Sequence, residues 1–218
     1  MKDYGYFSVF IERMPDLLDK LYEHISLTLL AVFLGCIVAI PLGIYLAKTS
    51  IQWIRPVIFN VINVFQTIPS LALLAMIAPL LGFGFKTAVV ALFLYSLMPI
   101  LKNTFAGFDS VDDEIIESAK GMGFSPVQQI VKIELPLALP YIMSGVRITT
   151  VYIISWAVLA GLIGAGGLGE LILAALSLND KPLVIASAVM AMILALVVDF
   201  VLGFIEKVTT KKSQTAKQ

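Results

Sequence analysis

Five long apolar runs, separated by short polar segments, dominate the pattern of this chain. They cover approximately residues 25–47, 56–81, 87–101, 137–162 and 183–205. A helix needs about 20 apolar residues to cross a hydrocarbon layer of roughly 30 Å. The pattern therefore predicts an all-α, polytopic membrane protein with five transmembrane helices, which form one membrane domain over residues 24–206.

Residues 1–23 follow a different pattern. Apolar residues recur there at helical spacing, and the charged side chains of Glu12, Arg13 and Asp16 lie opposite them. This predicts an amphipathic helix that lies in the membrane interface and is broken near Pro15, rather than a signal peptide. His24, at the end of this segment, is interpreted as an interfacial residue and not as a ligand.

A polar segment between the third and fourth runs predicts two short helices. Ser110 followed by Asp113 is a capping pattern that would begin the first helix. Gly121 and Gly123 would end it, because glycine accepts the left-handed conformation found at many helix ends.

The second short helix has a start and a stop of its own. Ser125 would cap it, with Pro126 at the first helical position and Gln128 completing a capping box. Pro136 would stop it, since proline has no N–H to continue the helical hydrogen bonds.

The composition agrees with a membrane domain and argues against several other classes. The chain is 59% hydrophobic and only 14% charged, against about 25% charged in soluble domains. Its net charge is zero, which argues against nucleic acid as a partner. With one cysteine (Cys36), one histidine and no clustered catalytic or metal-binding set, the sequence predicts neither an enzyme nor a cofactor or metal site.

Basic residues predict the orientation in the membrane. Five spans place the termini on opposite sides, and positive residues favour the cytoplasmic side. Two lysines lie in the loops of one side, Lys86 and Lys181. Nine basic residues lie on the other side, including those of the basic tail at residues 207–218: Lys48, Arg55, Lys102, Lys120, Lys132, Lys207, Lys211, Lys212 and Lys217. We therefore expect the C-terminus and the polar segment in the cytoplasm and the N-terminus outside.

Polar and aromatic residues interrupt the second, third and fourth spans. They could line a water-filled pathway or pack between helices, and the sequence leaves both open. The candidate pathway residues are Gln66, Thr67, Ser70, Tyr95, Ser155 and Trp156.

Two ionisable residues lie within the last two spans. Arg147 and Asp199 would sit at similar depths in antiparallel neighbours, and a lone charge in hydrocarbon is costly. We predict an intramembrane ion pair between them. The alternative is that each side chain extends to the cytoplasmic edge.

A glycine-rich stretch at residues 164–169 formally matches G-x-G-x-x-G. A dinucleotide-binding fingerprint requires a strand before it, whereas here a membrane span precedes it. We interpret the stretch as an external loop whose glycines allow close backbone packing.

The polar segment resembles a loop of importer permeases of the ATP-binding-cassette class. Their pattern is Glu-Ala-Ala, three residues, Gly, nine residues, Ile, one residue and Leu-Pro. Its matches here, with Ser118 in place of one Ala, are Glu117, Ala119, Gly123, Ile133, Leu135 and Pro136. The resemblance implies that this loop is a coupling helix that seats in a groove of the ATPase subunit. The alternative is an ordinary amphipathic loop.

Further stretches narrow the resemblance to permeases for quaternary-ammonium osmoprotectants such as glycine betaine, carnitine and choline. They lie at residues 24–27, 40–43, 66–73, 99–104 and 163–169, and the resemblance extends over roughly residues 20–206. Methionine permeases are closely related to this group of permeases. The fold and activity implied are those of an ATP-driven importer subunit, located in the bacterial cytoplasmic membrane and working by alternating access.

The resemblance also implies a set of partners. These are two copies of an ATP-binding subunit, a second permease subunit that forms a homodimer or a similar heterodimer, and a separate extracellular substrate-binding protein. A permease for methionine or another amino-acid-like solute is an alternative. An ion-coupled secondary carrier is another, although it would require inverted repeats and a path of ionisable residues.

Overall fold

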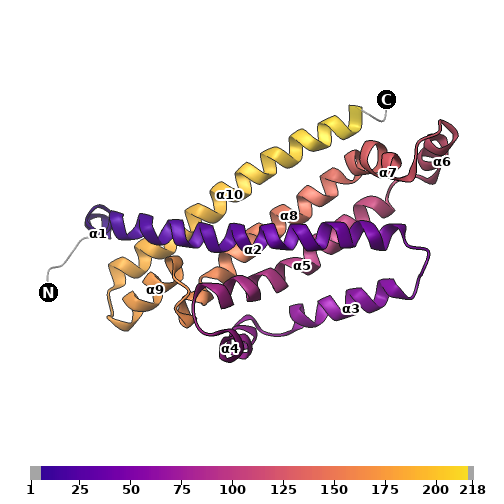
Figure 1. Ribbon diagram of the computed structural model, residues 1–218. Helices are drawn as coiled ribbons and strands as arrows, with labels where there is room; N and C mark the ends of the chain where they lie inside the picture. The colour runs from indigo at the N-terminus through magenta and orange to yellow at the C-terminus, as the bar shows by residue number, and fades with distance from the viewer. Residues whose placement is uncertain (1–5, 216–218) are drawn as a thin grey trace.

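The molecule is an elongated bundle of helices, most of which run along one axis (Figure 1). The computed structural model describes the backbone of residues 6–215 and the side chains of residues 8–210. In chain order its elements are α1 Tyr6–Glu12, α2 Met14–Lys48, α3 Ile54–Thr67, α4 Ser70–Leu81, α5 Phe85–Asp109, α6 Asp113–Gly121, α7 Pro126–Gln129, the π-helical segment η1 Ile130–Glu134, α8 Leu135–Ala157, the 3₁₀ segment η2 Leu159–Ile163, α9 Gly167–Ser177 and α10 Lys181–Thr215. The described residues contain no strand, which confirms the all-α prediction.

Within residues 6–215, four helical stretches are long and apolar enough to cross a membrane. They are α2, α5, the continuous stretch Pro126–Ala157 and the part of α10 up to Thr210. The predicted second span is two helices instead, because α3 and α4 are bent by 96° at residues 68–69. The number of candidate spans is therefore four, or five if the bent pair counts as one. Pro69 explains the break, since it directly precedes α4 and its ring disfavours helical backbone at Ile68.

The centre of the bundle is the contact between α2, α5 and α8. Small residues allow these helices to approach closely. A Cβ atom on Gly43 would lie 2.7 Å from Cβ of Thr104, and one on Gly145 would lie 2.6 Å from Cβ of Asn103. Such small-residue contacts are typical of helix pairs in membranes.

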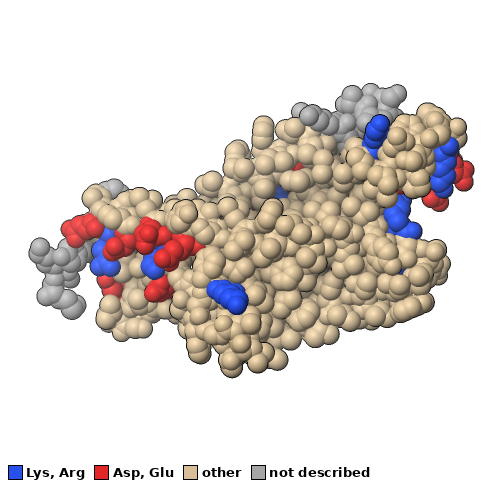
Figure 2. Space-filling model, viewed as in Figure 1, with Lys and Arg blue, Asp and Glu red and all other residues tan. Residues whose placement is uncertain are grey.

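Charged side chains lie toward the ends of the molecule. In the face shown in Figure 2 they gather near α1 and α9 at one end and near α6 and α7 at the other, and a mostly uncharged band separates them. The exposed face of α10 is apolar along the length of this band, with the large side chains Met192, Ile193, Leu196, Val197 and Phe200. This distribution fits a bilayer that surrounds the middle of the bundle.

The N-terminal segment differs in detail from the expectation. The helix break lies at Arg13, and Pro15 occupies the first turn of α2. Residues 14–23 therefore continue directly into the first apolar run. His24, expected at the interface, is fully buried, and its Nε2 lies 3.0 Å from the carbonyl oxygen of Ile154.

Candidate coupling interface and translocation face

Helix α6 begins the polar segment at one end of the bundle. Its cap is Asp112, whose side chain accepts a hydrogen bond from the Glu114 N–H at 3.1 Å. The predicted cap at Ser110 is wrong, because Ser110 instead caps the C-terminal end of α5, where its hydroxyl donates to the Gly107 carbonyl. An aspartate can supply the same side-chain oxygen acceptor as a serine, so the sequence offered two caps within three positions.

The turn after α6 is the one expected. The helix ends at Gly121, and Gly123 has a φ of +81°, a conformation that side-chain-bearing residues rarely adopt. Ser125 then caps α7, with its hydroxyl oxygen accepting from the Gln128 N–H and the Gln128 side chain accepting from the Ser125 N–H at 2.9 Å. The predicted capping box is confirmed.

The second short helix does not stop at Pro136. Instead, α7 continues through the π-helical segment into α8, and Pro136 lies in the first turn of that helix. The Leu135 N–H donates to the Ile130 carbonyl, five residues earlier. Proline is tolerated here because its missing N–H falls at the point where the helical pattern changes. We refer to residues 113–134 as the coupling segment.

The coupling segment presents an apolar surface at a polar end of the molecule. Three large side chains are mostly exposed there: Met122, Val127 and Val131, at 68%, 69% and 54%. Of the residues that carry the resemblance, Glu117, Gly123 and Pro136 are exposed, Ile133 and Leu135 are partly buried, and Ala119 is buried. An exposed apolar patch with a polar rim is typical of a surface that binds another protein.

The candidate pathway residues meet at the break between α3 and α4. The Gln66 side-chain amide donates to the backbone carbonyl of Tyr95, and the Tyr95 hydroxyl donates to the carbonyl of Ile68. The Tyr95 ring lies 4.6 Å from the Trp156 ring, centroid to centroid. Residues from the second, third and fourth apolar runs are thus brought together, and Tyr95 satisfies the Ile68 carbonyl at the break.

The remaining pathway candidates lie near this contact in the sequence but are more accessible. Thr67 and Ser155 are exposed, and each hydroxyl donates to a carbonyl of its own helix, that of Val64 at 2.8 Å and that of Val151 at 3.2 Å. Ser70 is partly buried at the first position of α4. Tyr152, 53% exposed, stacks on Trp156 with a centroid distance of 6.0 Å.

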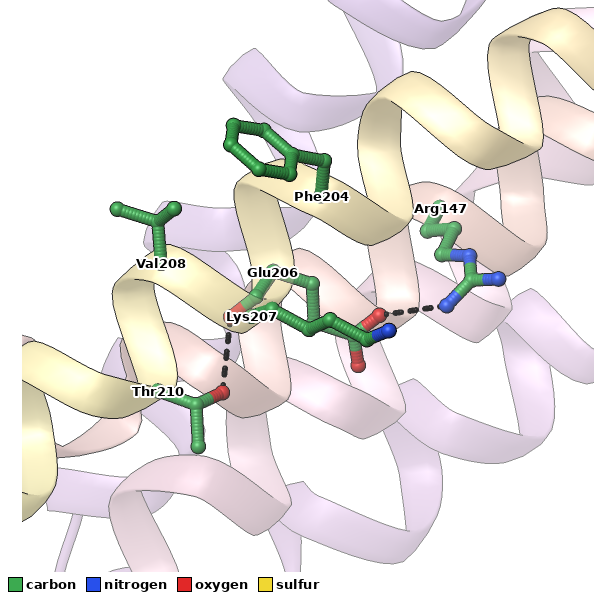
Figure 3. Close-up of a pocket in the computed structure, with 6 residues that line it drawn as sticks. All are labelled: Arg147, Phe204, Glu206, Lys207, Val208 and Thr210. Atoms are coloured by element: carbon green, nitrogen blue, oxygen red, sulfur yellow. Dashed lines mark hydrogen bonds and ion pairs between the residues drawn. The ribbon is translucent and has the colours of Figure 1, made fainter.

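Arg147 and Asp199 form an ion pair between α8 and α10. The Arg147 Nε and Nη2 atoms donate to the two carboxylate oxygens of Asp199 at 2.7 and 2.9 Å. The Nη1 atom also donates to Glu206 at 3.0 Å, and Figure 3 shows these two side chains directed toward each other. An open cavity of about 500 Å³ lies beside the contact, lined by Arg147, Phe204, Glu206, Lys207, Val208 and Thr210.

The glycine-rich stretch packs against the beginning of α2 at the opposite end from the coupling segment. The Gly167 N–H donates to the Glu23 carboxylate at 2.8 Å. Lys20 forms ion pairs with both Glu23 and Glu170, at 2.9 and 2.7 Å. A Cβ atom on Gly169 would overlap the backbone carbonyl of Val158. Gly166, Gly167 and Gly169 thus allow close packing, as expected, whereas Gly164 has open space around it. The stretch leads into the helix α9, which the sequence analysis did not predict.

Several contacts at both ends of α2 were not anticipated from the sequence. The sequence analysis assigned Glu23 and Lys20 to a separate interfacial helix. Glu134 lies at a position of the coupling pattern that any residue type can occupy. Glu134 is buried, and its carboxylate contacts the ammonium group of Lys48 at the end of α2. A signal was present, since Glu134 is an acidic residue flanked by Ile133 and Leu135. A charge within an apolar run generally needs a partner.

Comparison with known protein families identifies the class. Residues 39–211 match the family of binding-protein-dependent transport system inner membrane components. The chain belongs to this family, so it is the membrane permease component of an ATP-binding-cassette importer, and ATP hydrolysis is the task of a separate ATPase subunit.

The chain is similar over most of its length to several characterised permeases. It is 48% identical to the choline transport system permease protein OpuBB of Bacillus subtilis, over 89% of both chains. It is 46% identical to the glycine betaine/carnitine/choline permease protein OpuCB of the same organism, over 93% of both chains. It is 44% identical to the carnitine transport permease protein OpuCB of Listeria monocytogenes, over 96% of this chain and 95% of the relative.

Solved structures support the fold. A structure of the MetNI methionine ABC transporter in an inward-facing conformation matches with a TM-score of 0.80 and 23% identity, over 88% of this chain and 95% of that chain. An amino acid ABC transporter with histidines matches with a TM-score of 0.77 and 21% identity, over 94% and 98%. These likenesses establish the fold of an ATP-binding-cassette permease for this chain.

Proposed function

We propose that this chain moves a quaternary-ammonium osmoprotectant, such as glycine betaine, carnitine or choline, into the cell as part of an ATP-driven importer. The main support is the identity of 44–48% to permeases named for these compounds, which extends over most of each chain. By comparison, the methionine transporter is only 23% identical and supports the fold alone.

The coupling segment would receive the ATPase subunit. Its exposed apolar side chains, Met122, Val127 and Val131, provide the surface for a partner. The segment is covalently continuous with α5 and α8, so a movement of the ATPase would reach the membrane helices. Glu117, Ala119, Gly123, Ile133, Leu135 and Pro136 are the residues that we assign to this role.

The full transporter would contain two ATPase subunits, a second permease subunit and a separate receptor. A second permease, either a copy of this chain or a similar one, would form the pathway together with this chain. On this chain we assign to the pathway Gln66, Thr67, Ser70, Tyr95, Ser155 and Trp156. Support comes from the bend between α3 and α4, where Thr67 is exposed, because irregular backbone at membrane depth is tolerated where protein or water replaces lipid. Ser155, next to Trp156 in α8, is exposed as well.

The coupling segment and the C-terminus would face the cytoplasm, with the N-terminus outside the cell. The coupling segment and the end of α10 lie at one end of the bundle, while α1 and α9 lie at the other (Figure 1). The end with α6, α7 and the end of α10 carries the excess of basic residues. Residues 1–23 would contact the outer interface, and the ion pair of Arg147 with Asp199 and Glu206 would lie toward the cytoplasmic half of the membrane.

Transport by the reconstituted complex tests the proposal. Purified permease, its ATPase and its receptor are placed in lipid vesicles, and uptake of radiolabelled glycine betaine, carnitine, choline and methionine is measured. We expect uptake of at least one quaternary ammonium compound that requires both ATP and the receptor. Uptake of methionine alone would instead support an amino-acid permease.

A further inference from the structure

Glu134 is a buried carboxylate at the junction between the coupling segment and the membrane bundle. It is the last residue of the π-helical segment, and its side chain is only 3% exposed. Among the described residues, the ammonium group of Lys48 is the only polar partner of its Oε2 atom. A buried charge that loses its only partner is strongly destabilised, so Lys48 determines where this carboxylate can lie.

Lys48 belongs to a different part of the chain from the coupling segment. It is the last residue of α2, and the loop that follows α2 is held by Arg55, which donates to the carbonyls of Ala47 and Thr49. The coupling segment itself is joined by the backbone only to α5 and α8. The contact between Lys48 and Glu134 therefore connects the segment directly to a third long helix.

The other end of α2 holds the glycine-rich stretch before α9. There Glu23 accepts a hydrogen bond from the Gly167 N–H at 2.8 Å, and Lys20 pairs with Glu170 at 2.7 Å. Helix α2 is continuous between these contacts and runs the length of the bundle (Figure 1). One continuous helix thus contacts the coupling segment at one end and the opposite loop at the other.

We propose that the pair Lys48–Glu134 is a positioning pair that transmits movement of the coupling segment to α2, and through α2 to the loop at residues 164–167. This inference rests on the proposed function. The ion pair fixes the coupling segment to the end of α2, so the two move together when the ATPase moves. Without the pair, the segment still binds the ATPase through its exposed apolar surface, but it loses its charge contact with the end of α2 and acts on that helix only through the packing of α2 against α5 and α8.

The ratio of substrate imported to ATP hydrolysed tests this role in the complete transporter in lipid vesicles, with radiolabelled glycine betaine as the probe. We expect Glu134→Gln and Lys48→Gln each to lower the ratio by about tenfold, within the range produced by substitutions along a coupling network. The ATPase should still co-purify at the wild-type level. The exchange of both charges, Lys48→Glu with Glu134→Lys, should recover part of the ratio.

Lys132→Gln is the matched control, because Lys132 lies on the same π-helical segment but is exposed. It should keep the wild-type ratio. An unchanged ratio in both single variants would overturn the proposal. The proposal would also fail if the ATPase no longer co-purified with the single variants and the charge exchange did not restore it, because the pair would then serve stability alone. If the wild-type complex imports no quaternary ammonium compound, the proposed substrate fails. The coupling role is then judged by receptor-stimulated ATP hydrolysis in the same variants.

Discussion

Arg147 holds Asp199 through two parallel hydrogen bonds, from Nε and Nη2, at 2.7 and 2.9 Å. These two hydrogen bonds join α8 to α10. Gly203 leaves space for the guanidinium group, since a Cβ atom there would lie 2.9 Å from Cζ of Arg147. A third contact, to Glu206 at 3.0 Å, uses the remaining terminal nitrogen. One cation is therefore shared by two carboxylates, so the loss of Arg147 affects two ion pairs and the loss of either carboxylate affects one.

The number of ion pairs that each substitution breaks predicts the order of stability among variants. Asp199→Asn leaves Arg147 paired with Glu206, whereas Arg147→Gln leaves two carboxylates without a cation. We expect Arg147→Gln to lower the midpoint temperature of unfolding more than Asp199→Asn does. The midpoint can be measured in detergent with the purified protein.

A double-mutant cycle separates the pair from its surroundings. The variant that carries both Arg147→Gln and Asp199→Asn should be more stable than Arg147→Gln alone, because one of the unpaired carboxylates is removed. Additive losses would contradict a direct interaction between the two residues.

The sequence predicted the long helices because their signal is local. Four of the five apolar runs correspond to the long helices α2, α5, α8 and α10, and the capping box at Ser125 and Gln128 lies within four residues. The same local reasoning placed the cap of α6 at Ser110, where Asp112 performs that role. Two residues with similar capping chemistry lay too close together for the pattern to separate them.

Contacts between distant residues were much harder to predict. Arg147 and Asp199 could be matched because both are rare charges within apolar runs. The apolar neighbours of Glu134 indicated that this carboxylate needs a partner, but Lys48 lies at the end of an apolar run, where a charge ordinarily faces water, so nothing in the sequence matched the two residues. Helix α9 was missed because the glycines before it indicate a loop, and the support for its first turn comes from Glu23 in α2.

Gly123 tests the coupling segment. Its φ of +81° disfavours any other residue, while a Cβ atom there would meet no atom of this chain within 4 Å. Gly123→Asp should therefore cost on the order of 1 kcal/mol in backbone strain and leave the membrane helices folded. We expect normal protein levels with uptake nearly abolished, because the new side chain projects from the surface proposed for the ATPase.

Two further variants, at Gly121 and Gly123, distinguish backbone strain from obstruction of the ATPase by the added side chain. Gly121→Ala lies at the end of α6, also in open space but without a positive φ, and should retain uptake. Gly123→Asn tolerates the left-handed conformation better but still adds a side chain. Uptake that is normal in both Gly123 variants would remove this residue from the coupling surface.

Gly169 should be sensitive for a different reason. A Cβ atom there would overlap the backbone of Val158, which cannot move without disturbing the end of α8. We expect Gly169→Ala to lower the midpoint temperature of unfolding and the yield of folded protein. Gly164→Asn is the control, since Gly164 has a φ of +67° but open space around it. Equal stability of the two variants would contradict the packing argument.

The orientation can be tested with single cysteines in a Cys36→Ser background. Glu12 and Lys120 are both exposed and lie near opposite ends of the bundle, in α1 and α6. In intact cells, a thiol reagent that does not cross the membrane should label Glu12→Cys and not Lys120→Cys. Permeabilised cells should label both, which shows that each thiol is reactive. The reverse pattern in intact cells would invert the proposed topology.

Substrate selection is expected to lie in the receptor rather than in this chain. An aromatic cage holds a quaternary ammonium group between open ring faces. Here the rings of Tyr95 and Tyr152 pack against Trp156 at interplanar angles of 53° and 24°, and the Tyr95 hydroxyl is committed to the carbonyl of Ile68. Trp156 thus packs against both tyrosines, Tyr95 is buried, and only Tyr152 of the three side chains is mostly exposed, whereas a cage needs several open ring faces. Replacing the receptor with a homologue of different preference, with its docking surface retained, should shift uptake to the new compound. Uptake that keeps the original profile would place selection in the membrane helices, with Tyr152 and Trp156 as the first residues to replace.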